Sequence, residues 1–267
     1  MQNTTNILKN IVHRKRAEVA LQKVQQPIYT LMESPHFLRA SFSAKEALLG
    51  SRSSGIIAEF KRQSPSKGLI NGKVRVNDVV TSYQEAGASM VSVLTDEHFF
   101  GAQSNDFAIA RDVLNIPLLR KDFTVDPYQI YQAKAMGADV ILLIAAILEP
   151  DRCRDLAFLA HDLGMEVLLE LHDESELEYV NEFVDLVGIN NRNLEDFSVD
   201  TERSLRLAKQ LPSNLIRVAE SGLSDVATVQ EMKEKGFQAF LMGEYFMRHD
   251  LPGTACRDFI RNLQRQS

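Results

Sequence analysis

The sequence predicts an α/β fold in which eight parallel strands and their helices close into a (β/α)8 barrel. Eight short, mostly apolar runs of strand type recur along the chain, and helical patterns separate them. Such long connections favour parallel pairing with right-handed crossovers. An open, doubly wound sheet could also use eight strands, but no GxGxxG turn follows the first run. The predicted strands cover residues 56–60, 90–94, 118–120, 140–144, 166–171, 186–190, 215–219 and 239–242.

Glycines mark the ends of several predicted helices. Gly87, Gly137, Gly164 and Gly236 each lie two or three residues before a predicted strand. Because glycine readily takes the left-handed backbone conformation that ends a helix, these positions indicate a repeated helix, turn and strand unit.

The length of 267 residues is typical of one barrel domain, so we expect a single domain over residues 1–267. Residues 1–50 precede the first strand and are predicted to form an N-terminal helical extension, since no Gly/Ser-rich linker separates them from it. Ile7, Ile11 and Val12 recur at helical spacing there. This apolar stripe must pack against another part of the chain.

The composition excludes several classes of protein. Hydrophobic residues are 45% and charged residues 25%, as in ordinary globular proteins, and the net charge of −6 predicts no nucleic-acid partner. The longest apolar run, residues 140–148, is too short to cross a bilayer, so no membrane association is expected. We predict a cytoplasmic location because the N-terminus has no secretory signal, with an Arg-rich transit peptide as the alternative.

Cysteine and histidine spacing favours neither a disulfide framework nor a metal site. Cys153 and Cys256 are far apart and belong to no CxxC motif, which suits a reducing compartment. The six histidines form no HExxH or HxH pattern. The sequence therefore predicts no bound metal.

Charged and polar residues gather at the carboxyl ends of five predicted strands, where barrel enzymes hold their catalytic groups. One such residue could be an ordinary loop charge, and the pair at the first strand could be a surface ion pair, but agreement among five strands indicates a reaction centre. Two lysines and three carboxylates at one mouth would also shift each other's pKa values. In strand order the residues are Glu59 and Lys61, Lys121, Glu170, Asn190 with Arg192, and Glu220 with Ser221.

Two further patterns indicate how a ligand could be held. Gly222 and Gly243 follow the seventh and eighth strands, and residues 244–247 could form a short helix whose amides bind phosphate, although simple turns would also explain the glycines. Phe99 and Phe100, after the second strand, could cover a flat ring or merely pack their loop.

The chain resembles the indole-3-glycerol-phosphate synthase family over nearly its whole length. The resemblance implies a TIM-barrel lyase of tryptophan biosynthesis that needs no cofactor. Its small-molecule phosphorylated substrate would be 1-(2-carboxyphenylamino)-1-deoxyribulose 5-phosphate, whose indole ring closes with loss of carbon dioxide and water. The matching stretches are NILKNIVHRKRAEV, IIAEFKRQSPSKG, TDEHFFG, LLRKDF, GADVILLI, LLELHD, GINNRNL, VAESG and FLMGEYFMR.

The resemblance also implies roles for single residues, and it places the N-terminal helix over the catalytic mouth. Lys121 matches the general acid for ring closure and Glu170 its partner, while Lys61 lies near the substrate carboxylate and could act as a second acid. Glu59 and Asn190 match further catalytic positions. The expected substrate-binding residues are Ser64, Phe100, Arg192, Glu220, Ser221, Gly222 and Gly243.

Two departures from the family pattern affect substrate contacts. Gln63 stands where some relatives carry lysine, so a phosphate contact is either absent or supplied by Lys67. Ala102 follows Gly101 where a second glycine is frequent. Neither departure touches the predicted acids and bases.

Two alternative functions stay open at this point. Another phosphate-binding barrel enzyme, such as phosphoribosylanthranilate isomerase, would need a Cys/Asp type of acid and base pair, but Cys153 and Cys256 both lie in helical patterns. A catalytically silent, ligand-binding barrel would have no use for Lys61, Lys121 and Glu170. The sequence does not set the oligomeric state, and a monomer is the default expectation.

Overall fold

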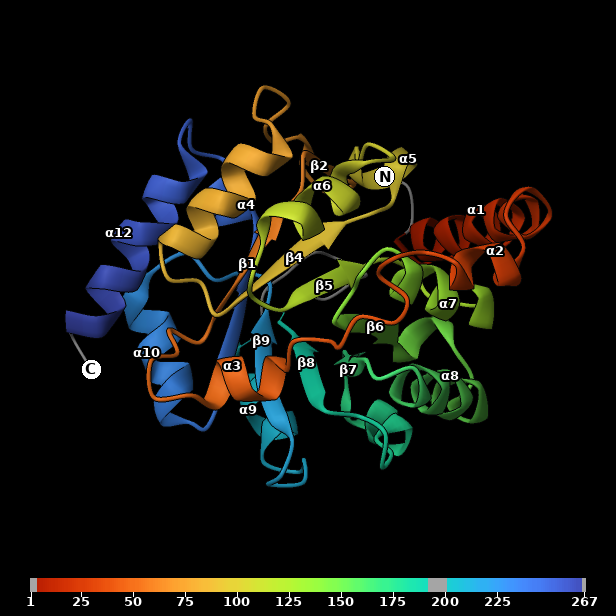
Figure 1. The fold of residues 1–267 in the computed structure, drawn as a ribbon. Helices are drawn as coiled ribbons and strands as arrows, with labels where there is room; N and C mark the ends of the chain where they lie inside the picture. Colours follow the sequence, from red (N-terminus) through yellow and green to blue (C-terminus); the bar gives the residue numbers. More distant parts are fainter. Residues whose placement is uncertain (1–3, 192–200, 266–267) are drawn as a thin grey trace.

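The computed structural model describes residues 4–191 and 201–265, and it confirms the predicted barrel (Figure 1). Eight parallel strands close in the order β1-β10-β9-β8-β7-β6-β5-β4. Their bounds are β1 Ile56–Phe60, β4 Met90–Leu94, β5 Leu118–Lys121, β6 Val140–Ile144, β7 Glu166–Leu171, β8 Leu186–Asn190, β9 Ile216–Glu220 and β10 Ala239–Met242.

Each predicted run became a barrel strand, with small shifts at two of them. β5 continues through Lys121, and β9 begins at Ile216 and ends at Glu220, one residue later than expected. Two further strands were not predicted, β2 Gln63–Ser64 and β3 Gly68–Leu69, which pair as an antiparallel hairpin after β1. Strands of two residues are too short to show an alternating pattern.

Helices surround the barrel (Figure 1). Gly87, Gly137, Gly164 and Gly236 all have positive φ angles, as expected for residues that end a helix. The outer elements are α4 Val76–Glu85, α5 Glu97–Phe100, α6 Asp106–Val113, α7 Pro127–Ala135, η1 Ala145–Ile147, α8 Pro150–Asp162, η2 Glu174–Tyr179, α9 Thr201–Ala208, α10 Val226–Glu234, α11 Glu244–Met247 and α12 Pro252–Arg265. Within the described ranges, none of the helices combines the length and apolarity needed to span a membrane.

The N-terminal residues form α1 Thr4–Gln25, α2 Ile28–Met32 and α3 Ala44–Leu49. Figure 1 shows α1 and α2 beside α7, on one flank of the barrel. Val19, Leu31 and Phe37 are buried there against Tyr128 and Ala135 of α7. The N-terminal extension therefore packs against α7 through a small hydrophobic cluster that is separate from the barrel interior.

The short helix α3 packs against the amino-terminal end of the barrel. Its Ala44 and Leu48 join the cluster that fills the barrel interior. That cluster also includes the first residues of several strands, among them Met90, Val140 and Ala239. Because α3 covers this end, the opposite end, where the strands finish, is the one that can open to a ligand.

Candidate active site

A cavity of about 440 Å³ lies at the carboxyl ends of the strands. Every predicted site residue that the structure describes lines it, whereas Arg192 lies outside the described residues. The residues brought together are Glu59, Lys61, Ser64, Phe100, Lys121, Glu170, Asn190, Glu220, Ser221, Gly222 and Gly243.

The period-two alternation of the strands explains why these residues meet. Side chains two positions apart on a strand share one face. In β5, Leu119 belongs to the cluster inside the barrel, so Lys121 points to the same interior at the end of the strand. The same spacing leads from Ile57 to Glu59, from Leu168 to Glu170, and from Val218 to Glu220.

Lys121 is held between two buried carboxylates. Its Nζ donates to Glu220 Oε2 at 2.6 Å and to Glu170 Oε2 at 3.1 Å. Burial acts to lower the pKa of Lys121, but the surrounding carboxylates, Glu170 first, outweigh it and raise the pKa above the usual value for lysine. Lys121 is therefore held in its charged, protonated form at the cavity wall.

Glu170 and Glu220 shift in opposite directions although both contact Lys121. Burial would raise the pKa of Glu170, but Lys121 and then His172 favour its charge, so the pKa falls well below the usual range. Asn190 Nδ2 also donates to Glu170 Oε1 at 3.0 Å. Burial raises the pKa of Glu220 to about 7, with repulsion from Glu170 adding to it and Lys121 opposing both. Glu220 is thus the carboxyl that can carry a proton near neutral pH.

Gly188 of β8 makes room for Glu220 on the neighbouring strand. A Cβ atom at residue 188 would collide with Glu220 Oε1 and would lie 3.1 Å from its Cδ. The position of this carboxylate therefore depends on a glycine that the sequence alone does not single out.

Glu59 and Lys61 form a second pair on the same wall. Lys61 Nζ donates to Glu59 Oε1 at 2.7 Å, and Ser92 donates to Glu59 Oε2 at 3.4 Å. A Cβ atom at Gly243 would lie 2.6 Å from Glu59 Oε1. The absence of a side chain at Gly243 thus leaves room for Glu59, and this role is separate from any backbone contact between Gly243 and a ligand.

His172 lines the cavity as well, although it is not among the residues predicted from the sequence. Its Nε2 lies 3.3 Å from Glu170 Oε1 and its Nδ1 lies 3.7 Å from Glu176 Oε2, but within residues 4–191 and 201–265 neither nitrogen has a partner with hydrogen-bond geometry. Burial favours the neutral ring, yet the two carboxylates raise the pKa of His172 to about 9. The signal that could have identified it is its spacing of two from Glu170.

The rim of the cavity beside β9 and β10 contains serine hydroxyl groups and exposes backbone at glycine residues. Ser221 and Gly222 have φ angles of 66° and 72°, and Ser221 is the only non-glycine among the described residues with positive φ. The predicted helix after Gly243 is present as α11. Ser64, Ser224 and Arg248 also line the cavity, and of these three only Ser64 is among the residues predicted from the sequence.

Aromatic and aliphatic side chains line the rest of the mouth. The rings of Phe100 and Phe123 lie 6.0 Å apart between centroids, and both face the cavity. Phe99 instead contacts His98 and does not line the cavity. Three residues of α1 complete the wall: Ile7, Leu8 and Ile11. The predicted helix therefore lies over the mouth, with Leu8 rather than Val12 in its apolar face toward the cavity.

The two departures from the family pattern have defined surroundings. Gln63 donates to the backbone carbonyl of His98 at 3.2 Å and packs against Gly101. Lys67 lies 3.6 Å from Glu244, which lines the cavity at the start of α11. Ala102 donates its amide to the carbonyl of Asp96 at 3.3 Å, so the loop closes without a second glycine.

Both cysteines lie away from the cavity. Cys153 in α8 and Cys256 in α12 are buried, and burial raises the pKa of each thiol to about 12. Neither can serve as an acid or base at the mouth. No group of three or more His, Cys, Asp or Glu side chains in the described parts of the chain is arranged for a metal ion, and metal independence stays a prediction.

The fold and the cavity define a barrel enzyme whose charged residues converge where the strands end. The chain belongs to the indole-3-glycerol phosphate synthase family, because the model of that family matches residues 8–259. It is 50% identical to the indole-3-glycerol phosphate synthase of Bacteroides thetaiotaomicron over 259 residues, which cover 97% of this chain and 99% of that protein.

Solved structures of other barrels share the fold at low identity. The 3-hexulose-6-phosphate synthase of Salmonella typhimurium gives a TM-score of 0.61 at 12% identity and covers 79% of this chain and 99% of its own. A mutant tryptophan synthase alpha-subunit from Pyrococcus furiosus gives 0.60 at 13% identity, with 79% and 98% covered. These likenesses support the fold alone.

Proposed function

We propose that the protein converts 1-(2-carboxyphenylamino)-1-deoxyribulose 5-phosphate to indole-3-glycerol phosphate, acting as a carboxy-lyase. Family membership supports the reaction. The single structural observation that carries the proposal is the Lys121 ammonium, fixed between Glu170 and Glu220 at the wall of the cavity. A fixed cation there suits a reaction that develops negative charge on a carbonyl oxygen.

Lys121 is the proposed acid for ring closure. The ring carbon that bears the carboxylate attacks the ketone carbon, and the carbonyl oxygen takes a proton from Lys121 as the new carbon–carbon bond forms. The aromatic system becomes cationic at this stage. Glu170, whose low pKa keeps it ionised, stabilises that positive charge.

Two eliminations complete the sequence. The carboxylate leaves as carbon dioxide, and its bonding electrons return to the ring and restore aromaticity. The hydroxyl formed earlier then leaves as water after accepting a proton, and the neighbouring methylene carbon beside the nitrogen loses a proton to solvent, which completes the indole. Lys61 is the proposed acid for this step, and Glu59 holds it in place through the 2.7 Å contact.

The remaining residues are proposed to hold the substrate. Asn190 orients Glu170, and Phe100 covers the aromatic ring together with Phe123. The backbone at Gly222 and Gly243 suits a phosphate group. Ser64, Glu220 and Ser221 complete the proposed binding set, and Arg192 keeps its predicted role only from the resemblance.

The alternatives have weaker support. An isomerase that depends on a cysteine would need a thiol at the mouth, but both thiols are buried elsewhere. A silent binding barrel does not explain a lysine held between two carboxylates. A cytoplasmic location, a monomeric state and the lack of a nucleic-acid partner remain predictions from the sequence.

Incubation of the purified protein with the carboxyphenylamino deoxyribulose phosphate tests the function directly. We expect indole fluorescence to appear at the same rate with and without EDTA, and without added nucleotide. A matched control is Lys45→Ala, which removes a half-exposed ion pair with Asp185 at the α3 end of the barrel and should leave the rate unchanged. Absence of product, or activity abolished by chelation and restored by a divalent ion, would refute the proposal.

A further inference from the structure

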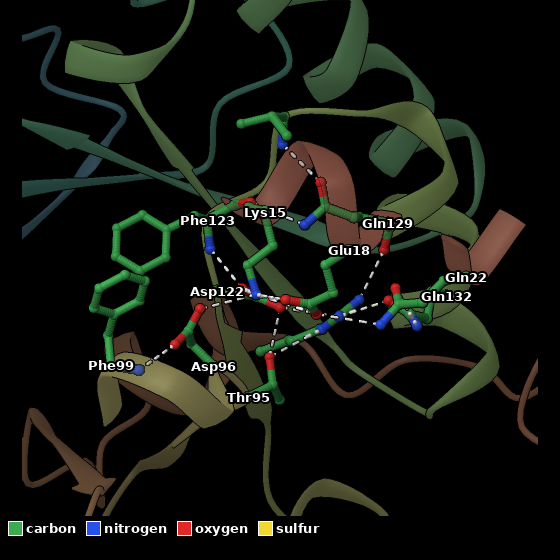
Figure 2. A network of polar contacts seen from close by, with 12 residues as sticks. Lys15, Glu18, Gln22, Thr95, Asp96, Phe99, Asp122, Phe123, Gln129 and Gln132 are labelled. Carbon is green, nitrogen blue, oxygen red and sulfur yellow. Dashed lines mark hydrogen bonds and ion pairs between the residues drawn. The ribbon is translucent and has the colours of Figure 1, made fainter. Parts of the chain in front are cut away.

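Lys15 on α1 is a fully buried lysine outside the set of proposed catalytic residues. Only 1% of the surface of Lys15 is exposed. Burying an ammonium group in this way costs free energy unless the charge is well paired. Its Nζ lies 3.0 Å from Asp96 Oδ2 and 3.0 Å from Asp122 Oδ1, and 3.2 Å from Glu18 Oε2. Figure 2 shows the side chain reaching from α1 into this group of carboxylates.

The two distant partners of Lys15 follow neighbouring strands of the barrel. Asp96 comes just after β4 and accepts from the Phe99 amide at 2.8 Å, so it caps α5, the helix that carries Phe100. Asp122 comes just after β5, directly next to Lys121. One ammonium therefore joins α1 to two loops that both border the cavity.

Asp122 has a network of its own that fixes the end of β5 (Figure 2). Arg120 donates to its Oδ2 at 3.0 Å, and Thr95 donates to the same oxygen at 2.8 Å. The Phe123 amide donates to Oδ1 at 2.8 Å. Burial would raise the pKa of Asp122, but Lys15 and Arg120 lower it, so the carboxylate is ionised. Its position restrains both residues that flank it, Lys121 and Phe123.

The same turn of α1 also forms part of the cavity wall. Ile11, one helical turn before Lys15, is 4% exposed and lines the cavity with Ile7 and Leu8. A shift of Lys15 would move this wall as well as the two loops.

We propose that Lys15 is a positioning residue for the reaction, which locks α1 over the mouth and sets the positions of Lys121, Phe100 and Phe123 through Asp122 and Asp96. This inference rests on the proposed function. Lys15 itself does not contact the reacting atoms, and it acts through the two carboxylates.

The test compares Lys15→Met with Lys23→Met. Lys23 also joins α1 to the barrel, through a 2.8 Å ion pair with Asp126, but it is half exposed and lies two turns farther along the helix. Lys15→Met should lower kcat about 10- to 100-fold, because small misplacements of reacting groups are costly, while Lys23→Met should keep the rate of the unmutated protein. Lys15→Arg, which keeps the charge, should recover most of the lost kcat.

The measurement is kcat and KM at a temperature where near-ultraviolet circular dichroism shows every variant folded. If Lys15→Met does not fold, Asp96→Asn replaces it, since the amide keeps the cap on α5 but loses the charge that pairs with Lys15. Equal kcat for Lys15→Met and Lys23→Met, or no recovery with Lys15→Arg, would overturn the proposal. Failure of the unmutated protein to form indole would instead overturn the proposed function.

Discussion

Two clusters of buried charge lie at the same end of the barrel and differ in how completely their groups are paired. Around Lys15, the carboxylates of Asp96 and Asp122 both have ion-pair and hydrogen-bond partners within the protein. Around Lys121, one oxygen of Glu220 and both ring nitrogens of His172 have no hydrogen-bond partner among the residues that the structure describes. The carboxylates of the first cluster are fully paired, whereas the second cluster contains buried polar atoms that lack a hydrogen bond within the described residues.

The pKa directions express the same difference. Burial opposes charge in both clusters, yet attraction raises the pKa of Lys15 and lowers the pKa of Asp122, so both favour their charged forms. In the other cluster, burial dominates and raises the pKa of Glu220 to about 7. A structural cluster thus stabilises its charges, while the candidate site holds one carboxyl near its titration point at neutral pH.

The largest effects are expected from residues of the Lys121 cluster. Lys121→Ala removes the proposed acid, and Glu170→Gln removes the charge that faces the cationic intermediate. Each should lower kcat about 10²–10⁴-fold with a smaller change in KM. Steady-state kinetics with circular dichroism measures both effects. Near-native kcat in either folded variant would remove that residue from the catalytic set.

A smaller effect is expected from Gly188→Ala, which disturbs the cluster without changing a charge. The new methyl group would push Glu220 away from Lys121. We expect kcat to fall about 10- to 100-fold and stability to fall by about 1–3 kcal/mol. Adding Glu220→Asp, which shortens the carboxylate, should make the double variant lose less than the two single effects combined. Strict additivity would show that residue 188 does not act through Glu220.

The sequence predicts the barrel and most of the cavity because both depend on short-range patterns. Buried parallel strands appear as continuous apolar runs, and alternation carries Glu59, Lys121, Glu170 and Glu220 to one interior face. His172 obeys the same alternation, so a stricter use of it would have included that residue.

Other features depend on contacts between distant parts of the chain and could not be predicted from local patterns. In the sequence, Lys15 is one of several basic residues of a predicted helix and nothing distinguishes it from the others. Only the tertiary structure shows that Asp96 and Asp122 lie next to it. The need for glycine at residue 188 likewise depends on Glu220 of the neighbouring strand. Packing and pairing of this kind leave no local periodicity.

The contrast between the clusters also predicts that replacing a buried carboxylate by its neutral amide has a different effect on the unfolding free energy in each cluster. Because the folded pKa of Glu220 is raised, its contribution to stability is fully present below about pH 4.5 and is lost as pH rises through about 7. The Glu220→Gln variant has no carboxyl group to ionise at this position, so it should not lose this stability as the pH rises. The folded pKa of Asp122 is lowered, so its contribution is present above about pH 4, and Asp122→Asn should destabilise the protein at every pH above that.

Urea unfolding at about pH 5 and about pH 8 tests the difference between the Lys15 and Lys121 clusters most directly. The measurement compares the unmutated protein with Glu220→Gln and Asp122→Asn. Relative to the unmutated protein, the unfolding free energy of Glu220→Gln should rise by about 2 kcal/mol between the two pH values. Asp122→Asn should be less stable by about 1–3 kcal/mol at both. A Glu220→Gln variant that is destabilised as much as Asp122→Asn at about pH 8 would contradict the distinction between the two clusters.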